Sequence, residues 1–515
     1  MNILKKYEQA LELYRAKKFS AALELVKKVQ KAAPHWKKSF LLEIFIRRDQ
    51  NEPIKELALL EKFLPRLDCN LSDDKDLAAD AFNCFGSVNR FLGRTADSVK
   101  GFCLSASLSD DKKKACEEIS NALFAASSAE NYSAADFQKL YDEYKKYLSD
   151  IKPYPKKFYR HEKIRVGFLS GNFQWHTVMS WSWHLLSELD KNSFKVYCYA
   201  SVKTPDEVTK YFQSIVEVWR DIYSLTDAAA AELIRADEID ILFDLDGHTL
   251  SNRLRVAAYH PATVQISGIG YMNSTGLECF DYFLSDIYCA GDETYFTEKV
   301  IKLPHSHFCY EPSTKLEPAT APPCIKNNFV TFGSFNQFGK MTDSIFIMWK
   351  KILDAVPNSR LILKHKIFGS NDGRNFVRER LKSFGFDISR VEMRPLTANH
   401  LVEYGDVDIA LDTFPYTGGV TTCEALYMGV PVISLYGNRH GTRFGLSILK
   451  NIGIDELAVS SYDEYINRAV AVAGDWELLT ILRKNLRGMM KKSPLMNSAN
   501  YVREVQDVFK KVSFP

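Results

Sequence analysis

The sequence predicts a helical region followed by two α/β domains, and three observations support this fold class. Residues 1–150 contain helix-length patterns and few strand-like runs. From Lys163 onward, short apolar runs alternate with helix-length segments, which is typical of a parallel sheet covered by helices. The alternation stops at a polar, proline-rich passage at residues 311–328 and then begins again, so we expect two such domains in tandem.

The length of the chain agrees with several domains, because 515 residues are too many for one hydrophobic core. We place the helical region at residues 1–150, the first α/β domain at 151–320 and the second at 321–515. Pro153, Pro155 and a cluster of Lys and Arg mark the first boundary. With 46% hydrophobic residues, each part can bury a core.

The helical region contains one segment with a repeat pattern. A tetratricopeptide repeat has an aromatic residue at its turn, a small residue where its helices pack, spaced apolar positions and a terminal proline. These positions match Tyr14, Phe19, Ala22, Val26, Val29 and Pro34. A weaker unit covers residues 85–108, with Gly93 at the turn and Ser98 at the small position. We predict a short stacked array, and a generic helical bundle is the alternative.

Ten apolar runs are the candidate strands. They are residues 164–169, 194–199, 239–245, 263–269 and 282–284 in the first domain, and 329–333, 361–364, 391–393, 407–411 and 432–435 in the second. Tandem sheets of this kind form a cleft at the carboxyl ends of their strands, where open α/β sheets bind ligands. Residues 475–514 read as helical, and we expect them to pack back across the domains.

Charge and leader features exclude several classes of protein. The net charge of +3, from 67 basic and 64 acidic residues, provides no field for nucleic acid or an anionic membrane. The first eight residues carry charges where a signal peptide needs an apolar core. No apolar run reaches the roughly 18 residues of a membrane span. We therefore expect a soluble, cytoplasmic protein whose nucleotide ligand, if any, is small.

The ten cysteines are scattered and form no C-x-x-C pair. This spacing supports neither a zinc framework nor a disulfide framework. We expect reduced cysteines that mostly serve packing.

The most informative stretch is residues 411–431, which reads as strand, glycine turn, helix and strand. Gly418 and Gly419 let the backbone approach a ligand, and Thr421 and Thr422 open a helix whose free N–H groups favour phosphate. Glu424 lies about one turn further, where its carboxylate can accept hydrogen bonds from ribose hydroxyls. The stretch predicts a seat for a nucleotide diphosphate. The alternative is an ordinary strand-to-helix turn with capping threonines and a solvated Glu424.

Two further turns supply candidate catalytic residues. His176 follows the first strand of the first domain, where a histidine can accept or relay a proton. Lys340 follows the first strand of the second domain and could neutralise a diphosphate leaving group. The alternatives are a structural histidine and a solvated lysine.

A third turn, residues 244–249, has weaker signals. Asp244 and Asp246 superficially match a D-x-D metal–nucleotide motif, but three residues are too few, and we set the match aside. His248 is a possible cleft residue, with a structural role as the alternative. The glycine-bearing turn at residues 268–276 lacks the spacing of a dinucleotide fingerprint.

Together these motifs resemble the O-linked N-acetylglucosamine transferase family, glycosyltransferase family 41, which also includes the plant Spindly protein-fucosyltransferases. The resemblance covers about residues 163–514. It rests on D-L-D-G-H-T at 244–249, G-S-F-N-Q-x-x-K at 333–340, L-D-T-F-P-Y-x-G-G at 411–419, T-T-C-E-A-L-Y-M-G-V-P at 421–431 and G-N-R-H-G-T-R-F-G at 437–445. It implies a GT-B fold, a metal-independent inverting mechanism without a cofactor, and a protein hydroxyl as acceptor.

The resemblance also assigns roles. His176 matches the family's active-site histidine near the acceptor, and Lys340 matches its diphosphate-binding lysine, with Gln337 beside it. His400 matches a histidine that packs on the nucleobase, and Glu424 takes the ribose-binding acidic position. The expected nucleotide-sugar site comprises Asn336, Gln337, His400, Gly418, Gly419, Thr421, Thr422 and Glu424, with His176 and Lys340 as catalytic residues, His248 as a possible cleft residue and no metal ligand.

The chain departs from the family pattern in ways that bear on the donor. Animal members have a histidine where this chain has Gly419 and an aspartate where it has Glu424. The sequence of residues 423–431 is closer to that of bacterial and Spindly-like members. We predict transfer of N-acetylglucosamine from UDP-N-acetylglucosamine to Ser or Thr of a protein bound by the helical array. The alternatives are GDP-fucose or UDP-glucose as donor, or a non-catalytic helical-repeat scaffold.

Overall fold

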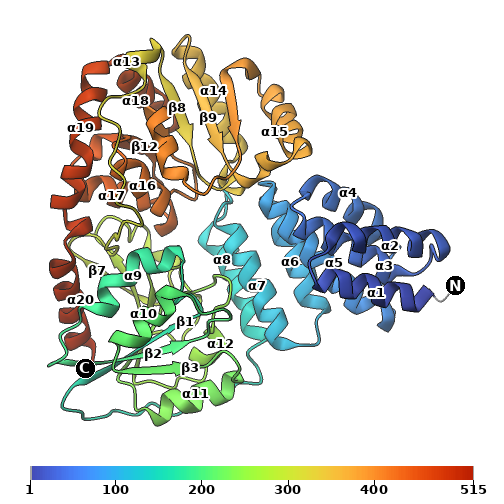
Figure 1. Cartoon of the computed structure of the whole chain (residues 1–515). Coiled ribbons are helices and arrows are strands. Elements are labelled where there is room, and N and C mark those ends of the chain that lie inside the picture. Colours follow the sequence, from blue (N-terminus) through green and yellow to red (C-terminus); the bar gives the residue numbers. More distant parts are fainter. Residues whose placement is uncertain (1–2, 514–515) are drawn as a thin grey trace. The chain divides into compact units, whose positions relative to one another are not determined.

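The computed structural model describes residues 3–513 and contains an all-α region followed by two parallel sheets with their helices (Figure 1). The predicted fold class is therefore confirmed. Among the described residues, none of the helices combines the length and hydrophobicity that a membrane crossing requires.

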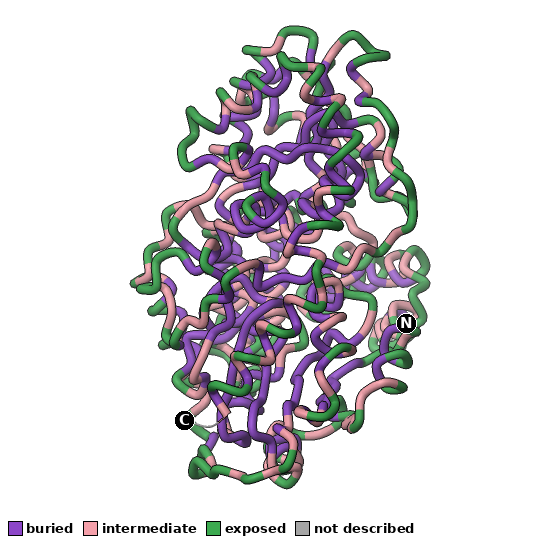
Figure 2. Tube along the Cα trace, turned by 90° about the vertical axis from the view of Figure 1, so that its left-hand side faces the viewer, coloured by how far each residue is buried: buried purple, intermediate pink, exposed green. Residues whose placement is uncertain are grey.

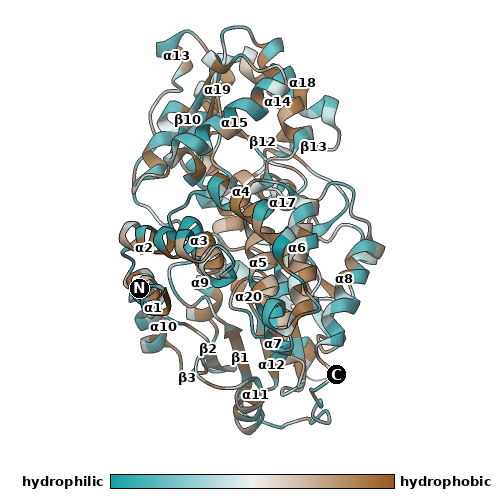
Figure 3. Cartoon of the chain, turned by 90° about the vertical axis from the view of Figure 1, so that its right-hand side faces the viewer, coloured by the Kyte–Doolittle hydropathy of each residue, from teal (hydrophilic) through white to brown (hydrophobic). Residues whose placement is uncertain are grey.

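Helices with short connections make up the first part of the chain. They are α1 (Ile3–Arg15), α2 (Phe19–Ala32), α3 (Lys37–Asp49), α4 (Pro53–Phe63), α5 (Ser72–Phe91), α6 (Thr95–Leu108), α7 (Lys112–Ala126) and α8 (Ala134–Lys146). Both hydrophobic and hydrophilic colouring occur along α1, α2 and α3 in Figure 3, as expected for helices that bury one face.

Both predicted helix pairs are present. In the first pair, Ala10, Ala22 and Val26 are fully buried, and the rings of Tyr14 and Phe19 lie 6.1 Å apart at the turn. In the second pair, α5 and α6 are joined through Gly93, whose φ of +75° suits glycine. The assignment of these pairs to tetratricopeptide repeats stays a prediction.

The first sheet has seven parallel strands in the order β3-β2-β1-β4-β5-β6-β7. They are β1 (Ile164–Ser170), β2 (Phe194–Ala200), β3 (Val218–Asp221), β4 (Ile241–Asp244), β5 (Val264–Gly268), β6 (Tyr282–Asp286) and β7 (Lys299–Leu303). The helices between them are α9 (Thr177–Ser187), α10 (Glu207–Ile215), α11 (Asp227–Ala236) and α12 (Leu254–Ala257). The edge strands β3 and β7 were not predicted.

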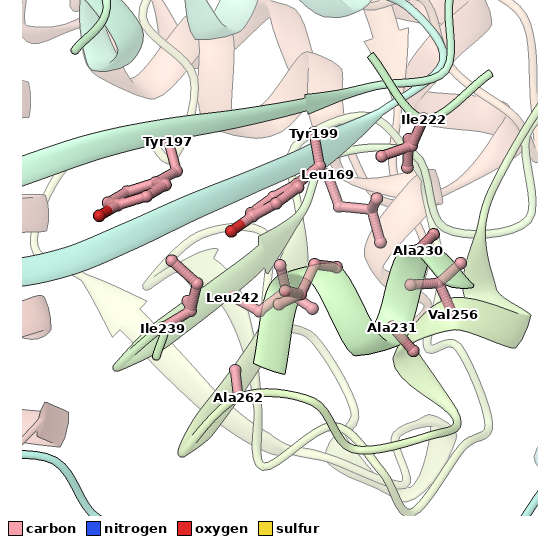
Figure 4. Packing of buried hydrophobic residues seen from close by; sticks show 11 residues of the cluster. Leu169, Tyr197, Tyr199, Ile222, Ala230, Ala231, Ile239, Leu242, Val256 and Ala262 are labelled. Carbon is pink, nitrogen blue, oxygen red and sulfur yellow. The ribbon is translucent and has the colours of Figure 1, made fainter. Parts of the chain in front are cut away.

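Apolar packing against α11 holds one face of this sheet. Side chains of three strands, Leu169 of β1, Tyr199 of β2 and Leu242 of β4, form one buried cluster with Ala230 and Ala231 of α11 (Figure 4). Strands β4 and β5 are buried along their whole length. Figure 2 marks the buried residues in purple.

The second sheet has six strands in the order β10-β9-β8-β11-β12-β13. They are β8 (Thr331–Ser334), β9 (Arg360–Lys364), β10 (Val391–Arg394), β11 (Ile409–Leu411), β12 (Val432–Leu435) and β13 (Ala458–Val459), and β13 was not predicted. Its helices are α13 (Cys324–Asn327), α14 (Asp343–Ala355), α15 (Asn371–Ser383), α16 (Val420–Tyr427), α17 (Phe444–Ile452) and α18 (Tyr462–Gly474). The predicted linker therefore ends in a short helix.

Two helices close the chain, α19 (Trp476–Lys492) and α20 (Ser498–Ser513). The ring of Phe509 in α20 lies 6.1 Å from the ring of Phe194 in β2 and 6.1 Å from that of Phe243 in β4. The closing segment thus returns from the second sheet to the first, as predicted.

The chain divides into two compact units, each built from segments that are separate in the sequence. The first contains the chain up to Ala129 together with Gln337–Thr342 and Leu363–Leu396. The second contains Glu130–Asn336, Asp343–Ile362 and the chain from Thr397 onward. Helix α8 therefore belongs with the first sheet, where the Tyr141 hydroxyl donates to the carbonyl of Ser274 at 3.1 Å. The domain boundaries at residues 150 and 320 stay a prediction.

Within the first unit, the helices hold the segment 337–342. A Cβ added to Gly339 would lie 2.3 Å from the carbonyl oxygen of Arg90, so this backbone approach requires glycine. The Arg380 guanidinium of α15 donates to the carbonyl of Leu92 at 3.3 Å. The C-terminal end of α5 is thus a support for the residues around Gly339.

Arg483 of α19 offers a test of what holds the second unit together. Its buried guanidinium donates to the carbonyls of Tyr404 and Met428, both at 3.2 Å, and to that of Val407. We expect Arg483→Met to lower the free energy of unfolding by about 3 kcal/mol or more, because buried carbonyls lose their donor. Denaturant unfolding measures this loss, and the exposed Arg503→Met should change it by less than about 0.5 kcal/mol. Equal effects would contradict the assigned role.

Candidate active site

A pocket lies at the carboxyl ends of β8 and β11, next to the start of α16. It is lined by Gly333, Ser334, Phe335, Asn336, Tyr404, Ala410, Leu411, Asp412, Thr421, Thr422, Ala425 and Val432. Three of the predicted nucleotide-sugar residues, Asn336, Thr421 and Thr422, are in its wall. The position agrees with the rule that open α/β sheets bind ligands at the carboxyl ends of their strands.

The Asp412 carboxylate, directly after β11, organises the glycine turn. Its Oδ1 accepts hydrogen bonds from the amides of Thr413 at 2.8 Å and Gly418 at 2.7 Å, and its Oδ2 accepts one from the Ser434 hydroxyl at 2.7 Å. A Cβ added to Gly418 would lie 2.3 Å from Oγ1 of Thr422. The turn is therefore closed around the carboxylate, and a larger residue at position 418 would displace the Thr422 hydroxyl.

Helix α16 begins directly after this turn, with Gly419 at its N-cap. In the described structure no side chain caps this helix start, so N–H groups of its first turn are left for another acceptor. The Thr421 hydroxyl donates to Oδ1 of Asn336 at 3.1 Å. Trp181 of α9 lies against the turn, since its Cζ2 is 3.4 Å from the position of a Cβ on Gly419. The predicted strand, turn and helix are thus present as expected.

The residues predicted for the base and the ribose lie side by side. Nε2 of His400 is 3.1 Å from Oε2 of Glu424, which is buried one turn into α16. Beside them, the Tyr404 hydroxyl donates to the carbonyl of Thr421 at 3.2 Å, and its ring stacks on Phe335 with centroids 4.5 Å apart. An imidazole, a carboxylate and two aromatic rings therefore gather at one end of α16.

His176 is the N-cap residue of α9, and its Nδ1 accepts a hydrogen bond from the amide of Val178 at 3.3 Å. The side chain is exposed, yet the protein atoms around the ring lower the pKa of His176 below its usual value of 6.5. The lowered pKa favours the neutral imidazole, which is the form that can accept a proton.

Asp246 holds the loop that leads to His176. Its Oδ1 accepts from the Ser170 hydroxyl and from the Asn172 side chain, each at 2.8 Å, and its Oδ2 accepts from the amide of Gly171 at 2.7 Å. Asp244 is also buried and accepts from the Ser267 hydroxyl at 2.8 Å. The two carboxylates of the D-x-D motif therefore serve the interior of the first sheet.

His248 lies in the interior, only 1% exposed. Its Nε2 donates to the carbonyl of Thr275 at 2.8 Å, and its ring is packed by Tyr144 and Tyr271 at 5.0 Å and 5.5 Å between centroids. Burial lowers the pKa of His248 to about 4. These surroundings are those of a structural histidine and not of a cleft edge.

Gln337 and Lys340 belong to the first unit, although they closely follow Asn336 in the chain. Residues Phe338–Lys340 form a short 3-10 turn, and the Lys340 amide donates to the carbonyl of Gln337 at 2.9 Å. The Lys340 side chain is half-buried.

Four residues that the geometry brings to the site were not predicted as site residues from the sequence: Trp181, Phe335, Tyr404 and Asp412. The available signal for Asp412 was a carboxylate placed directly after a buried strand, because a buried carboxylate needs hydrogen-bond donors. Tyr404 and Trp181 had no distinguishing local signal.

Comparisons with known proteins agree with this geometry. The model of glycosyl transferase family 41 matches residues 145–318 and 319–505. A probable UDP-N-acetylglucosamine--peptide N-acetylglucosaminyltransferase SPINDLY of Solanum lycopersicum is 37% identical over 383 residues, which is 73% of this chain and 40% of that protein. The protein of the same printed activity named SEC, from Arabidopsis thaliana, is 28% identical over 360 residues, covering 67% of this chain and 36% of that protein.

A solved structure extends the similarity to the helical region. A lysine-to-methionine mutant of the O-GlcNAc transferase from Thermobaculum terrenum superposes with a TM-score of 0.87 at 26% identity, covering 99% of this chain and 97% of that chain. The resemblance inferred from the motifs is confirmed, and the two sheets form a GT-B fold. The chain spans about 40% of the length of the curated SPINDLY relatives.

The buried carboxyls predict a pH dependence of stability. Burial and the neighbouring Asp244 raise the pKa of Asp246 to about 7, whereas an unfolded aspartate has a pKa of about 3.9. The folded state thus retains a proton that the unfolded state releases, so stability falls as pH rises from about 4 to about 7. We expect the melting temperature of Asp246→Asn to change less with pH between pH 5 and pH 8 than that of the wild type.

Thermal melts across this pH range measure the effect, and Asp221→Asn, which removes an exposed carboxylate, is the matched control. An unchanged pH slope in Asp246→Asn would show that the carboxyl ionises equally in the folded and unfolded states.

Proposed function

Because the chain belongs to glycosyl transferase family 41, we propose that it is a cytoplasmic enzyme that transfers N-acetylglucosamine from UDP-N-acetylglucosamine to a Ser or Thr hydroxyl of a protein. The observation that carries the proposal is the similarity to an O-GlcNAc transferase over nearly the whole chain, combined with a pocket at the start of α16. The names of the curated relatives print the same donor and a peptide acceptor.

In this proposal, the donor diphosphate binds at the glycine turn and the first turn of α16. The uncapped N–H groups and the helix dipole favour an anion there. Thr421 and Thr422 add hydroxyl donors, and Gly418 and Gly419 leave room for close approach of the phosphates. Lys340 supplies positive charge that stabilises the diphosphate as it leaves.

In the same proposal, the nucleoside binds at His400 and Glu424, next to Tyr404 of the pocket wall. The Glu424 carboxylate accepts hydrogen bonds from the two ribose hydroxyls, and the His400 ring packs on the base. The 3.1 Å contact between the two side chains supports the proposal, because it holds the carboxylate and the imidazole within one nucleoside length of each other.

The chemical step is an inverting displacement. The acceptor oxygen forms a bond to the anomeric carbon while the bond from that carbon to the diphosphate breaks, and the hydroxyl proton leaves to a base. His176 is the proposed proton acceptor, and its lowered pKa supports this role since the neutral imidazole predominates at pH 7. No metal ion is required in this scheme, because Lys340 and the start of α16 carry the compensating charge.

We assign acceptor binding to the helices α1–α7. The first unit joins these helices to the segment 337–342, and Gly339 packs on the carbonyl of Arg90. An acceptor bound to these helices would thus be held by the same compact unit that carries Lys340.

A GDP-fucose donor is the second candidate. The chain is 37% identical to a SPINDLY protein and 28% identical to SEC. This difference and the sequence of residues 423–431 favour the Spindly branch of the family. Uracil and guanine differ by one ring, so a pocket built for one base should reject the other by a few kcal/mol.

Calorimetry with UDP and GDP tests the nucleoside assignment. We expect UDP to bind more tightly than GDP, and Glu424→Gln to weaken UDP about tenfold, because an amide replaces one acceptor with a donor. Binding of inorganic pyrophosphate should be unchanged in this variant, since it has no ribose. Glu456→Gln, at an exposed position, is the control. Tighter binding of GDP would overturn the UDP assignment.

Transfer itself is measured by mass spectrometry of candidate protein acceptors after incubation with UDP-N-acetylglucosamine, GDP-fucose or UDP-glucose. We expect N-acetylglucosamine on Ser or Thr, and a fall in turnover of about a hundredfold or more in Lys340→Ala with little change in UDP affinity, because charge develops in the transition state. An equal fall in UDP affinity would mean that Lys340 binds the diphosphate equally well in the ground state and the transition state. Absence of transfer from every donor would favour a non-catalytic scaffold.

A further inference from the structure

Three potential metal ligands meet in the interior of the second unit. They are Cys289, which follows β6, His307, which follows β7, and His440, which follows β12. One ligand atom from each residue lies within 4.8 Å of the others, and all three side chains are buried. The cluster joins the two sheets, because two of its members come from the first and one from the second.

Each imidazole is anchored through Nδ1. That atom lies 2.5 Å from Oδ2 of Asp286 in His307 and 3.2 Å from the carbonyl oxygen of Met272 in His440. A neutral histidine that donates from Nδ1 to such an acceptor presents a lone pair on Nε2. Metal-binding histidines characteristically have this arrangement, in which an outer carboxylate or carbonyl fixes the tautomer and the ring orientation.

The outward nitrogens lack partners. Among the described residues, Nε2 of His307 and Nε2 of His440 are both buried and neither has a hydrogen-bond partner. Leaving two buried polar atoms unsatisfied costs free energy. Two such atoms in one cluster therefore favour binding of a group that interacts with both. The thiol of Cys289 makes a weak contact, 3.4 Å to the carbonyl oxygen of Arg443.

The surroundings of the cluster favour one class of ion. The His440 ring meets the rings of Phe283 at 5.1 Å and Phe444 at 5.4 Å, and the His307 ring meets Phe308 at 3.9 Å. Imidazole and thiolate donors suit a borderline transition-metal ion, whereas Mg²⁺ and Ca²⁺ prefer oxygen ligands.

We propose that Cys289, His307 and His440 bind a Zn²⁺ ion that cross-links the two α/β domains, with a water molecule in the fourth tetrahedral position. Nε2 of each histidine and the Cys289 thiolate are the protein ligands, and the thiol proton is released to solvent on binding. The ion is separate from catalysis, and this site was not predicted because its ligands come from three distant loops.

The site would also steady the diphosphate turn. The carbonyl of Gly441, next to His440, accepts a hydrogen bond from the Thr417 hydroxyl at 3.1 Å. Thr417 directly precedes Gly418, so fixing His440 limits the motion of the loop behind the turn.

The test uses the full chain purified without a metal-affinity tag. Elemental analysis after gel filtration should find one zinc per chain. Exchange of zinc for Co²⁺ should give a thiolate-to-cobalt charge-transfer band, which Cys289→Ser removes and Cys198→Ser, at a buried cysteine of β2, retains. A strong chelator should lower the melting temperature of the wild type by several degrees and that of His440→Asn much less.

The outcomes separate the proposal from its alternatives. Protein that takes up neither Zn²⁺ nor Co²⁺ to one equivalent would overturn it, and would leave His307 and Asp286 as a buried hydrogen-bonded pair. Metal uptake that is unchanged in both Cys289→Ser and His440→Asn would place the ion elsewhere. Cu⁺ held by the same residues would overturn the choice of zinc. If a variant does not fold, the cobalt spectrum of the wild type still decides whether a thiolate is a ligand.

Discussion

The Asp412 carboxylate is the interaction on which the candidate site depends. A carboxylate buried at the end of a central strand needs hydrogen-bond donors, and here they are the amides of Thr413 and Gly418 and the hydroxyl of Ser434. The Tyr465 hydroxyl fixes the same residue through its carbonyl at 2.8 Å. Closing the turn in this way determines where α16 begins, and hence where its free N–H groups lie.

In the first sheet, too, a buried carboxylate accepts hydrogen bonds from a loop. Asp246 follows β4 and binds Ser170, Gly171 and Asn172 of the loop between β1 and α9. Each domain thus places a buried carboxylate after a central strand, where it folds the loop that carries candidate site residues. The carboxylate oxygens of the D-x-D sequence thus accept hydrogen bonds from the protein itself.

The helices also support the segment Gln337–Thr342, which belongs to the same compact unit. A segment that is continuous in sequence with the second α/β domain is held by contacts with α5, including Gly339 on Arg90. Under the proposed function, acceptor recognition and the charge that stabilises the leaving group would then depend on one compact unit.

Much of the fold could be predicted from local patterns. The central strands are buried on both faces, so they appear as continuous apolar runs, and β1, β2 and β4 lie where those runs predicted. The strands that were missed are all at sheet edges: β3, β7 and β13. The side chains of β3 are all partly or fully exposed, so an apolar run is absent and the pattern carries no signal.

The candidate site divides in the same way. The sequence by itself determined the glycine turn, the start of α16 and the place of Glu424 one turn later, because these follow from residue types and spacing within a single stretch. Only the tertiary structure decided that His248 is interior, that Asp412 closes the turn, and that Cys289, His307 and His440 meet. Those relations join loops far apart in the chain, and the packing of the sheets, which no local pattern encodes, brings them together.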